Sequence, residues 1–177
     1  MFLDLSKAYD CLDRELLVRK LEMYGIRGNA HKWLVSYVNN RIQTVSVTKD
    51  GKTSRSNFLN TEFGIAQGSV LGPVLFIIFI NDLCNTLDVS RKIVKYADDT
   101  NLLIGGCDRE SILNQGRWFL NDVNQWFTQN RLILNESKTN IMLFRTKHSK
   151  TERPAHFNNG TYQIPFADNT KFLGIVT

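Results

Sequence analysis

The sequence predicts an α+β fold in which helices pack on one face of an antiparallel sheet. Apolar residues recur at helical spacing in several segments, and short apolar runs bounded by turn residues lie between them. The resulting order is a strand, two helices, two strands, a helix, two strands, a helix and further strands. Strands and helices mixed in this way are typical of an α+β domain.

In the first half of the chain, the predicted helices follow from the spacing of their apolar residues. Leu17, Leu21 and Tyr24 share one helix face, and Gly25 is placed to end that helix. The dipeptide Asp50-Gly51 indicates a hairpin between two strands. The expected elements are a strand at Phe2–Leu5, helices at Asp13–Tyr24 and Asn29–Val38, and strands at Ile42–Val47 and Ser54–Phe63.

In the second half, a helix from Pro73 to about Leu83 is apolar nearly all round, and a helix of this kind is expected to be deeply buried. A tight turn at Ala97-Asp98-Asp99 is expected between two short strands. The elements are strands at Lys92–Tyr96 and Thr100–Ile104, an amphipathic helix at Ser111–Gln129, strands at Leu132–Leu134 and Asn140–Phe144 around a turn at Asn135–Lys138, a polar loop at Thr146–Gly160, and strands at Tyr162–Pro165 and Lys171–Ile175.

Length and composition indicate one globular domain. The chain has 177 residues, and its 22 basic and 17 acidic side chains give a net charge of +5. Three distant cysteines exclude a disulfide scaffold and a CxxC metal knuckle. The longest apolar run, Val70–Ile80, is shorter than the roughly 20 residues of a membrane span, so we expect no membrane partner. The chain starts and stops inside apolar segments, which indicates a fragment.

Three aspartates carry the strongest chemical signal. Asp98 and Asp99 are adjacent at the tip of an apolar hairpin, where two carboxylates repel each other and a divalent cation would relieve the repulsion. Asp4 lies between two leucines on a strand, where an unpaired carboxylate is costly. Together they suit two metal ions roughly 4 Å apart, for in-line displacement at phosphorus. The alternatives are a solvated Asp-Asp turn and an edge-strand aspartate that faces solvent.

Two weaker signals concern phosphate chemistry. Gln67-Gly68-Ser69 opens the apolar helix, where backbone N–H groups suit a phosphate or a nucleotide edge. Lys138 follows a turn and could act as an acid near a departing phosphate. The alternatives are an ordinary loop and a solvated surface lysine.

Five segments follow one another in a fixed order along the chain, and a sixth lies between the first two. The five are Phe2–Asp10, Ala66–Pro73 (continued by Ile80–Leu83), Tyr96–Thr100, Trp126–Thr139 and Phe172–Gly174, and the sixth is Trp33–Gln43. In this order the five resemble motifs A, B, C, D and E of reverse transcriptases from non-LTR (LINE-type, jockey-like) retrotransposons, and the sixth is similar to the segment that these elements carry between motifs A and B.

This resemblance implies a polymerase palm, formed by residues 1–177 and truncated at both ends. It places the chain in a right-hand polymerase architecture that lacks most of the fingers and the thumb, as well as the endonuclease portion of the parent polyprotein. The implied reaction is RNA-directed DNA synthesis, by two-metal nucleotidyl transfer from a dNTP to a primer 3′-OH. The implied partners are an RNA template, a DNA primer and dNTPs, and the family favours the nucleus over the cytoplasm.

The resemblance also implies a role for each matching residue. The implied catalytic residues are Asp4, Asp98, Asp99 and Lys138, and the three aspartates with the Leu5 carbonyl are implied to bind two Mg²⁺ ions, with Mn²⁺ as a substitute. The implied dNTP-binding residues are Tyr9, Gln67 and Gly68, of which Tyr9 excludes a ribose 2′-OH. The implied primer grip is formed by Phe172, Leu173 and Gly174.

Ile65-Ala66 departs from the family pattern, because Val-Pro usually precedes the Gln-Gly pair of motif B. The loss of a rigid proline is expected to loosen this loop without removing its chemistry. Two other interpretations stay open: a group II intron-type reverse transcriptase, and an inactive retroelement remnant that at most binds nucleic acid. An RNA-dependent RNA polymerase is disfavoured by Tyr9 at the gate position. We expect weak or no activity from these residues alone.

Overall fold

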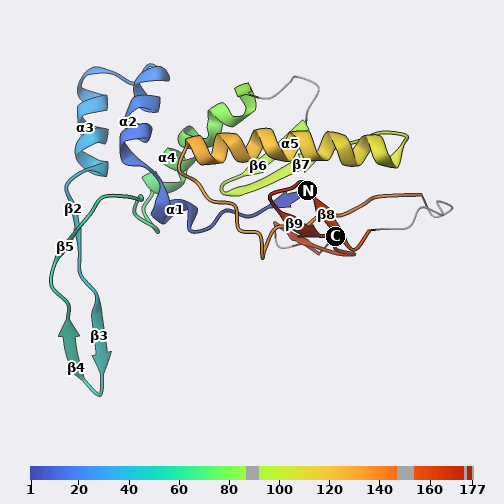
Figure 1. Ribbon diagram of the computed structural model, residues 1–177. Coiled ribbons are helices and arrows are strands. Elements are labelled where there is room, and N and C mark those ends of the chain that lie inside the picture. The colour runs from blue at the N-terminus through green and yellow to red at the C-terminus, as the bar shows by residue number, and fades with distance from the viewer. Residues whose placement is uncertain (87–91, 147–153, 174, 177) are drawn as a thin grey trace. The chain divides into compact units, whose positions relative to one another are not determined.

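A computed structural model describes residues 1–86, 92–146, 154–173 and 175–176 of the chain (Figure 1). The chain forms two compact units. Unit 1 combines Met1–Ala8 with Asn81–Thr177, and unit 2 is Tyr9–Ile80. Helices and antiparallel strand pairs are present in both units, which confirms the mixed helix and antiparallel sheet character predicted from the sequence.

Unit 1 is built on a three-stranded antiparallel sheet with the order β1-β7-β6. The strands are β1 (Phe2–Leu3), β6 (Lys92–Tyr96) and β7 (Asp99–Leu103). Phe2 pairs with Asn101 on one side and forms an isolated bridge with Asn140 on the other. A second isolated bridge joins Leu5 to Leu134. The segments before and after residues 135–139 therefore both lie against the N-terminal strand.

The long helix of unit 1 is α5 (Arg109–Gln129), and its capping residue lies just before it. Asp108 accepts a hydrogen bond from the Ser111 backbone N–H at 2.8 Å, as an N-cap residue does. One face of α5 is buried, at Gly116, Phe119, Leu120, Val123, Trp126 and Phe127. A Cβ at Gly116 would meet the Met1 Cε at 2.8 Å, so this glycine allows α5 to pack closely on the N-terminus. The amphipathic helix predicted here is confirmed.

The rest of unit 1 consists of short elements. They are the 3-10 helix η1 (Asn81–Thr86) and the strand pairs β8 (His156–Asn158) with β9 (Gln163–Pro165), and β10 (Lys171–Phe172) with β11 (Ile175–Val176). The strands predicted at Leu132–Leu134 and Asn140–Phe144 are wrong, because only isolated bridges form there. Of the loop predicted at Thr146–Gly160, residues 147–153 lie outside the described residues, and β8 occupies part of the remainder.

Unit 2 contains the helices α2 (Arg14–Met23), α3 (Gly28–Val38) and α4 (Leu71–Ile80), and α2 contacts both of the others. The short helix α1 (Ala8–Cys11) leads into it. Asp13 caps α2 by accepting a hydrogen bond from the Leu16 N–H at 2.9 Å. Buried Lys20 of α2 donates to the Phe79 carbonyl of α4 at 2.7 Å, so a polar contact supplements the apolar packing.

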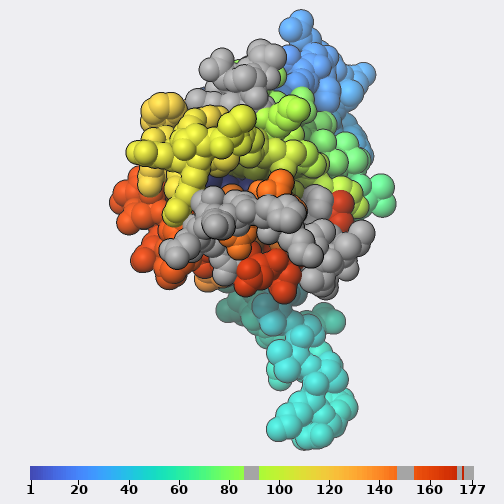
Figure 2. Space-filling view, turned by 90° about the vertical axis from the view of Figure 1, so that its right-hand side faces the viewer, coloured from blue at the N-terminus to red at the C-terminus, as the bar shows by residue number. Residues whose placement is uncertain are grey.

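A two-stranded ribbon extends from the helices of unit 2, and Figure 2 shows its turquoise tip as a narrow projection. It consists of β2 (Arg41–Gln43) paired with β5 (Leu59–Thr61), followed by β3 (Ser46–Lys49) paired with β4 (Lys52–Arg55). Asp50-Gly51 forms the predicted turn, and both residues have positive φ. Each of the two long strands predicted here is interrupted, because residues 44–45 and 56–58 leave the ladder.

The apolar helix of unit 2 differs from its prediction in extent and burial. It begins at Leu71 and ends at Ile80, and η1 continues the chain. Leu75, Phe76 and Phe79 are at most 1% exposed, whereas Val74 and Ile77 are 50% and 53% exposed. The prediction of a deeply buried helix is therefore wrong for one face.

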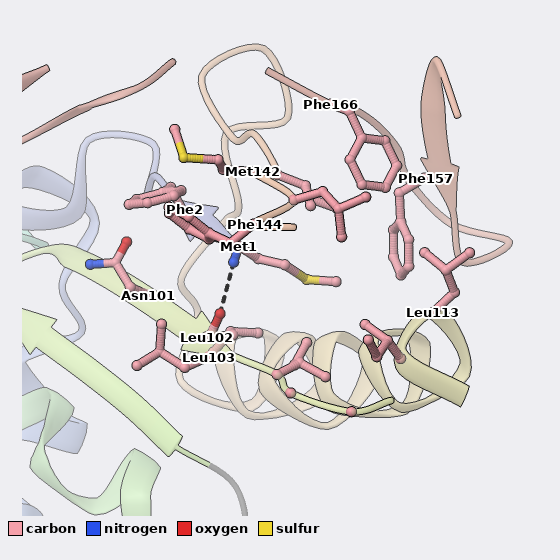
Figure 3. A pocket seen from close by; sticks show the side chains of 16 residues that line it. Met1, Phe2, Asn101, Leu102, Leu103, Leu113, Met142, Phe144, Phe157 and Phe166 are labelled. Carbon is pink, nitrogen blue, oxygen red and sulfur yellow. Dashed lines mark hydrogen bonds between the residues drawn. The ribbon is translucent and has the colours of Figure 1, made fainter. Parts of the chain in front are cut away.

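An apolar cavity of about 190 Å³ lies in unit 1 beside the chain terminus (Figure 3). Leu102, Phe157 and Phe166 are among its lining residues. The Met1 amino group donates a hydrogen bond to the Leu102 carbonyl at 2.7 Å. Burial lowers the pKa of this amino group from 8.0 to about 6, because a charged ammonium is poorly solvated there.

Within the described ranges, none of the helices is at once long enough and apolar enough to cross a membrane.

Candidate active site

The predicted site residues fall into two sets, one in each unit. Asp4, Leu5, Asp98, Asp99 and Lys138 belong to unit 1, together with the C-terminal residues predicted to hold a primer. Unit 2 contains Tyr9, Gln67 and Gly68.

Asp98 and Asp99 occupy different positions in the β6–β7 hairpin. Asp99 is the first residue of β7 and pairs with Tyr96, so the turn is Ala97-Asp98 rather than the predicted three residues. Ala97 has a φ of +51°, a conformation that costs roughly 1–2 kcal/mol for a residue with a Cβ. This two-residue turn leaves both carboxylates half-buried at the end of the sheet.

Asp4 is held by the turn that follows Leu134, through every polar group it has. Its backbone N–H donates to Thr139 Oγ1 at 3.2 Å, and its carbonyl accepts from the Asn135 N–H at 2.8 Å. Its carboxylate Oδ2 accepts from Asn135 Nδ2 at 3.0 Å. Ser137 Oγ donates to Asn135 Oδ1 at 2.7 Å, which fixes the amide with its NH₂ group toward Asp4. The turn therefore orients the Asp4 carboxylate.

The strand register brings Asp4 close to the Asp98-Asp99 pair, because Leu3 pairs with Thr100 and Asp4 follows Leu3 while Asp99 precedes Thr100. Burial raises the pKa of Asp99 above its ordinary value, and the negative charges of Asp98 and then Asp4 raise it further. Each of these causes disfavours the charged carboxylate. Negative charge is thus concentrated where β1 and the β6–β7 hairpin lie together in one sheet.

The donor atoms at this site fit a hard divalent cation. Carboxylate and carbonyl oxygens are the ligands that Mg²⁺ prefers, and a cation would offset the repulsion that raises the pKa of Asp99. The bridge between Leu5 and Leu134 is made by the flanking residues, from the Ser6 N–H to the Ile133 carbonyl and from the Asn135 N–H to the Asp4 carbonyl, so the bridge itself does not use the Leu5 carbonyl. The described part of the chain contains no group of three or more His, Cys, Asp or Glu residues already close enough to enclose an ion.

Lys138 lies at the end of the turn that holds Asp4. Its backbone N–H donates to the Asn135 carbonyl at 3.2 Å, which confirms the predicted turn. The side chain is exposed and contacts no carboxylate within the described residues. The turn thus connects Lys138 to Asp4 through Asn135.

The Gln-Gly-Ser segment of unit 2 forms a tight turn before α4. Ser69 Oγ donates to the Ala66 carbonyl at 2.7 Å and accepts from the Gly72 N–H at 3.0 Å, which closes the turn without the proline that is missing here. Exposed Gln67 donates from Nε2 to Asp10 Oδ1 at 2.8 Å. No atom lies within 4 Å of the position of a Cβ at Gly68, so a ligand can approach the backbone there.

Tyr9 of unit 2 is half-buried against α4. Its ring stacks on Phe76, with ring centroids 4.8 Å apart and planes 21° apart. This contact fixes the ring, because Phe76 is fully buried. A fixed aromatic side chain is what a steric role requires.

The residues predicted to hold a primer lie near the C-terminus. Phe172 ends β10, and Leu173 is 50% exposed in the turn toward β11 with a φ of +49°. Gly174 lies outside the described residues. The structure thus places this segment in a hairpin rather than in the single strand predicted.

Asn135 and Thr139 were not among the site residues predicted from sequence, although both lie within the motif D segment. An asparagine at the start of a turn usually bonds its own backbone, so its position alone indicates only a turn. The bond to Asp4 joins residues 131 positions apart and becomes visible only in the folded chain.

Comparison with known proteins gives one family match over the whole chain. Residues 1–177 match the family described as reverse transcriptase (RNA-dependent DNA polymerase). A relative named "Putative 115 kDa protein in type-1 retrotransposable element R1DM", from Drosophila melanogaster, is 27% identical over 98% of this chain and 16% of its own length. "RNA-directed DNA polymerase from mobile element jockey", from Drosophila funebris, is 26% identical over 99% of this chain and 19% of its own length.

A third relative is "Retrovirus-related Pol polyprotein from type-1 retrotransposable element R1", from Bradysia coprophila. It is 29% identical over 63% of this chain and 11% of its own length. The chain thus spans less than one fifth of the length of each of these three relatives.

Proposed function

Because this chain belongs to the reverse transcriptase (RNA-dependent DNA polymerase) family, we propose that it forms the palm region of an RNA-directed DNA polymerase from a non-LTR retrotransposon. The reaction is attack of a primer 3′-OH on the α-phosphate of a dNTP, with release of pyrophosphate. The observation that carries this proposal is the concentration of negative charge from Asp98 and Asp4 around Asp99. A carboxylate cluster of this kind suits nucleotidyl transfer better than a purely structural turn.

The residues of unit 1 provide the metal-binding carboxylates and the proton donor for this reaction. Asp4 and Asp98 would hold the two divalent ions, Asp99 would add its carboxylate, and the Leu5 carbonyl would complete one coordination shell. Mg²⁺, or Mn²⁺ in its place, would supply a lower pKa for the attacking hydroxyl and positive charge beside the leaving pyrophosphate. Asn135 keeps the Asp4 carboxylate oriented, through the 3.0 Å hydrogen bond to Oδ2. Lys138 supplies a proton to the departing pyrophosphate.

The residues of unit 2 bind and select the incoming nucleotide. Gln67 and the Gly68 backbone contact the dNTP, and the exposed amide and the open space around Gly68 support these roles. Tyr9 excludes a ribose 2′-OH, a role supported by its stacking on buried Phe76. In unit 1, Phe172, Leu173 and Gly174 hold the primer end. The RNA template and the DNA primer are the macromolecular partners.

Incorporation of dTTP on poly(rA)·oligo(dT) in the presence of Mg²⁺ tests this proposal, in an active polymerase that contains residues 1–177, because weak or no activity is expected from these residues alone. The Asp98→Ala, Asp99→Ala double variant is expected to lose incorporation, because it lacks two of the proposed carboxylates. The Glu15→Ala, Glu62→Ala double variant removes two exposed carboxylates elsewhere and is expected to retain it. Equal activity in both double variants would contradict the proposed site.

Titration with Mn²⁺, followed by the electron paramagnetic resonance of the free ion, tests the site without requiring turnover. The chain is expected to bind Mn²⁺, and the Asp98→Ala, Asp99→Ala variant to bind it at least tenfold more weakly. The Glu15→Ala, Glu62→Ala variant is expected to bind as the unaltered chain does. Unchanged binding in the aspartate variant would favour the alternative of an inactive remnant that binds only nucleic acid.

A further inference from the structure

A polar cavity of about 440 Å³ lies in unit 2, beside the β2–β5 ribbon and the first turn of α2. The residues that line it include Asp10, Arg14, Arg41, Gln43 and Thr61. Arg41 and Thr61 are directly paired in the ribbon, and the Thr61 hydroxyl donates to the Arg41 carbonyl at 3.2 Å. Asp10 contacts the proposed nucleotide-binding residue Gln67, and the other four have no role in the proposed polymerase chemistry.

Arg14 places a fixed positive charge in the wall of this cavity. The side chain is buried, and its donors reach the carbonyl of Gly64 and that of Phe63, each at 2.7 Å. It also donates to the Thr61 hydroxyl at 2.7 Å and to the Thr61 carbonyl. Because all of these acceptors are neutral, the guanidinium charge is held rigidly without being neutralised.

Arg41 adds a second guanidinium that is not engaged by the protein. The residue is half-buried, and within the described part of the chain its side chain has no hydrogen-bond or ion-pair partner. Burial lowers the pKa of Arg14, and the nearby charge of Arg41 lowers it further. The two positive charges beside this cavity repel each other, and an anion bound between or beside them would offset that repulsion by attracting both.

Asp10 is the acidic residue among the described residues that line the cavity, and its carboxylate already accepts a hydrogen bond. Its Oδ1 accepts a hydrogen bond from Gln67 Nε2 at 2.8 Å. Gln43 pairs with Leu59 in the ribbon and is exposed, so its amide is available as a neutral donor. The cavity thus combines two guanidinium charges with an amide donor and a single carboxylate that is bonded elsewhere.

We propose that the Arg14–Arg41 cavity is a binding site for a phosphate group of a nucleic-acid backbone. The Arg41 guanidinium contacts the phosphate oxygens directly, in the forked geometry that suits two oxygens of one group. Arg14 acts as the fixed charge behind it, and Gln43 donates a neutral hydrogen bond. This inference rests on the proposed function, since that function supplies the nucleic acid. The triphosphate of a dNTP has the same chemistry and is the other source.

The first arm of the test asks whether the cavity binds phosphate at all. Inorganic phosphate is titrated into the ¹⁵N-labelled chain, and the Nε–Hε signal of Arg14 is followed by NMR. A saturable shift is expected in the unaltered chain and is expected to be lost in Arg41→Gln. Because the Arg41 side chain has no partner among the residues that the structure describes, this variant is expected to fold, whereas a variant at Arg14 would lose four hydrogen bonds. An absent shift, or one that persists in Arg41→Gln, would overturn the proposal.

The second arm identifies the source of the phosphate. Binding of poly(rA)·oligo(dT) is measured over a series of salt concentrations. Arg41→Gln is expected to weaken binding and to reduce the log–log salt slope by about 1, the value for loss of one phosphate contact. Arg19→Gln removes an equal charge from an exposed site on the same unit and is expected to leave the slope unchanged. Equal slopes in all three proteins would overturn the proposal.

Binding of dTTP distinguishes a backbone phosphate from the triphosphate of a dNTP. Together with hybrid binding, it also distinguishes failure of the cavity assignment from failure of the proposed function. The affinity for dTTP is expected to be the same in Arg41→Gln and the unaltered chain, and a loss confined to dTTP would overturn the backbone assignment. If the hybrid binds equally well to both proteins, the proposed function stands and this cavity assignment fails. If the unaltered chain shifts with phosphate yet binds no hybrid, the nucleic-acid assignment and the proposed function fail together.

Discussion

The side-chain amide of Asn135 donates to the carboxylate of Asp4 at 3.0 Å and so joins two residues that are 131 positions apart in the sequence. Its orientation is set by Ser137, whose hydroxyl donates to the amide oxygen at 2.7 Å. The two backbone bonds of Asp4 go to the same turn, through Asn135 and Thr139. The turn and the proposed metal ligand thus form one hydrogen-bonded unit.

Asn135→Ala is therefore expected to weaken Mn²⁺ binding by roughly fivefold, which corresponds to about 1 kcal/mol for a partly exposed hydrogen bond to a charged group. The reason is that Asp4 loses the donor that orients its carboxylate. Asn57→Ala, at an exposed site in unit 2, is the matched control and should bind as the unaltered chain does. Unchanged or tighter Mn²⁺ binding in Asn135→Ala would show that this bond does not position Asp4.

Arg14→Met is expected to destabilise the chain by roughly 3–5 kcal/mol, because three carbonyls and a hydroxyl lose their buried donor. Urea unfolding followed by circular dichroism measures this change. Arg19→Met is the control on the same helix, where the side chain is exposed, and should change stability by less than about 0.5 kcal/mol. Similar unfolding midpoints for the two variants would be incompatible with the role described for Arg14.

Gly64→Ala is expected to destabilise the chain through backbone strain and a clash. Gly64 has a φ of +79°, and a Cβ there would lie 2.7 Å from the Asp10 carbonyl oxygen. Gly51 has a φ of +75° with open space around it, so Gly51→Ala isolates the strain at about 1 kcal/mol. The difference between the two free energies of unfolding then measures the close approach of residue 64 to α1. Equal losses would mean that the clash is relieved by a backbone shift.

The buried Met1 amino group is expected to make stability depend on pH between about 6 and 8. The pKa is 8.0 in the unfolded chain and about 6 when folded, so the unfolded chain binds more protons in this range. The free energy of unfolding should therefore rise with pH, by on the order of 2 kcal/mol over this range. Urea unfolding at several pH values checks the slope. A chain acetylated at its N-terminus should lack this part of the dependence, and identical slopes would contradict it.

Tyr9→Val is expected to raise incorporation of ribonucleotides relative to deoxyribonucleotides in any active polymerase that contains this segment. The smaller side chain would remove the ring that is stacked on Phe76 and that is proposed to exclude a 2′-OH. Tyr9→Phe retains the ring and should retain the discrimination. Primer extension with each nucleotide class gives the ratio, and an unchanged ratio in Tyr9→Val would refute the gate.

Local sequence predicted those elements whose signals lie within a few residues. The Asp50-Gly51 turn and the helices α2, α3 and α5 all follow from turn residues and apolar spacing. The predictions failed where pairing partners are distant. Leu132–Leu134 and Asn140–Phe144 have the apolar character of strands, yet the first makes one isolated bridge and the second makes two, and neither extends into a ladder with the short strand β1.

The sequence by itself determined the family, through the order and spacing of its motifs, and it predicted that three aspartates are the acidic residues of the site. Only the tertiary structure decided what holds and surrounds them. The bond from Asn135 to Asp4, the raised pKa of Asp99 and the cavity beside Arg14 and Arg41 each depend on residues far apart in the chain. Hydrogen bonds and charge interactions act over a few ångströms in space, whereas motif spacing records only separation along the backbone.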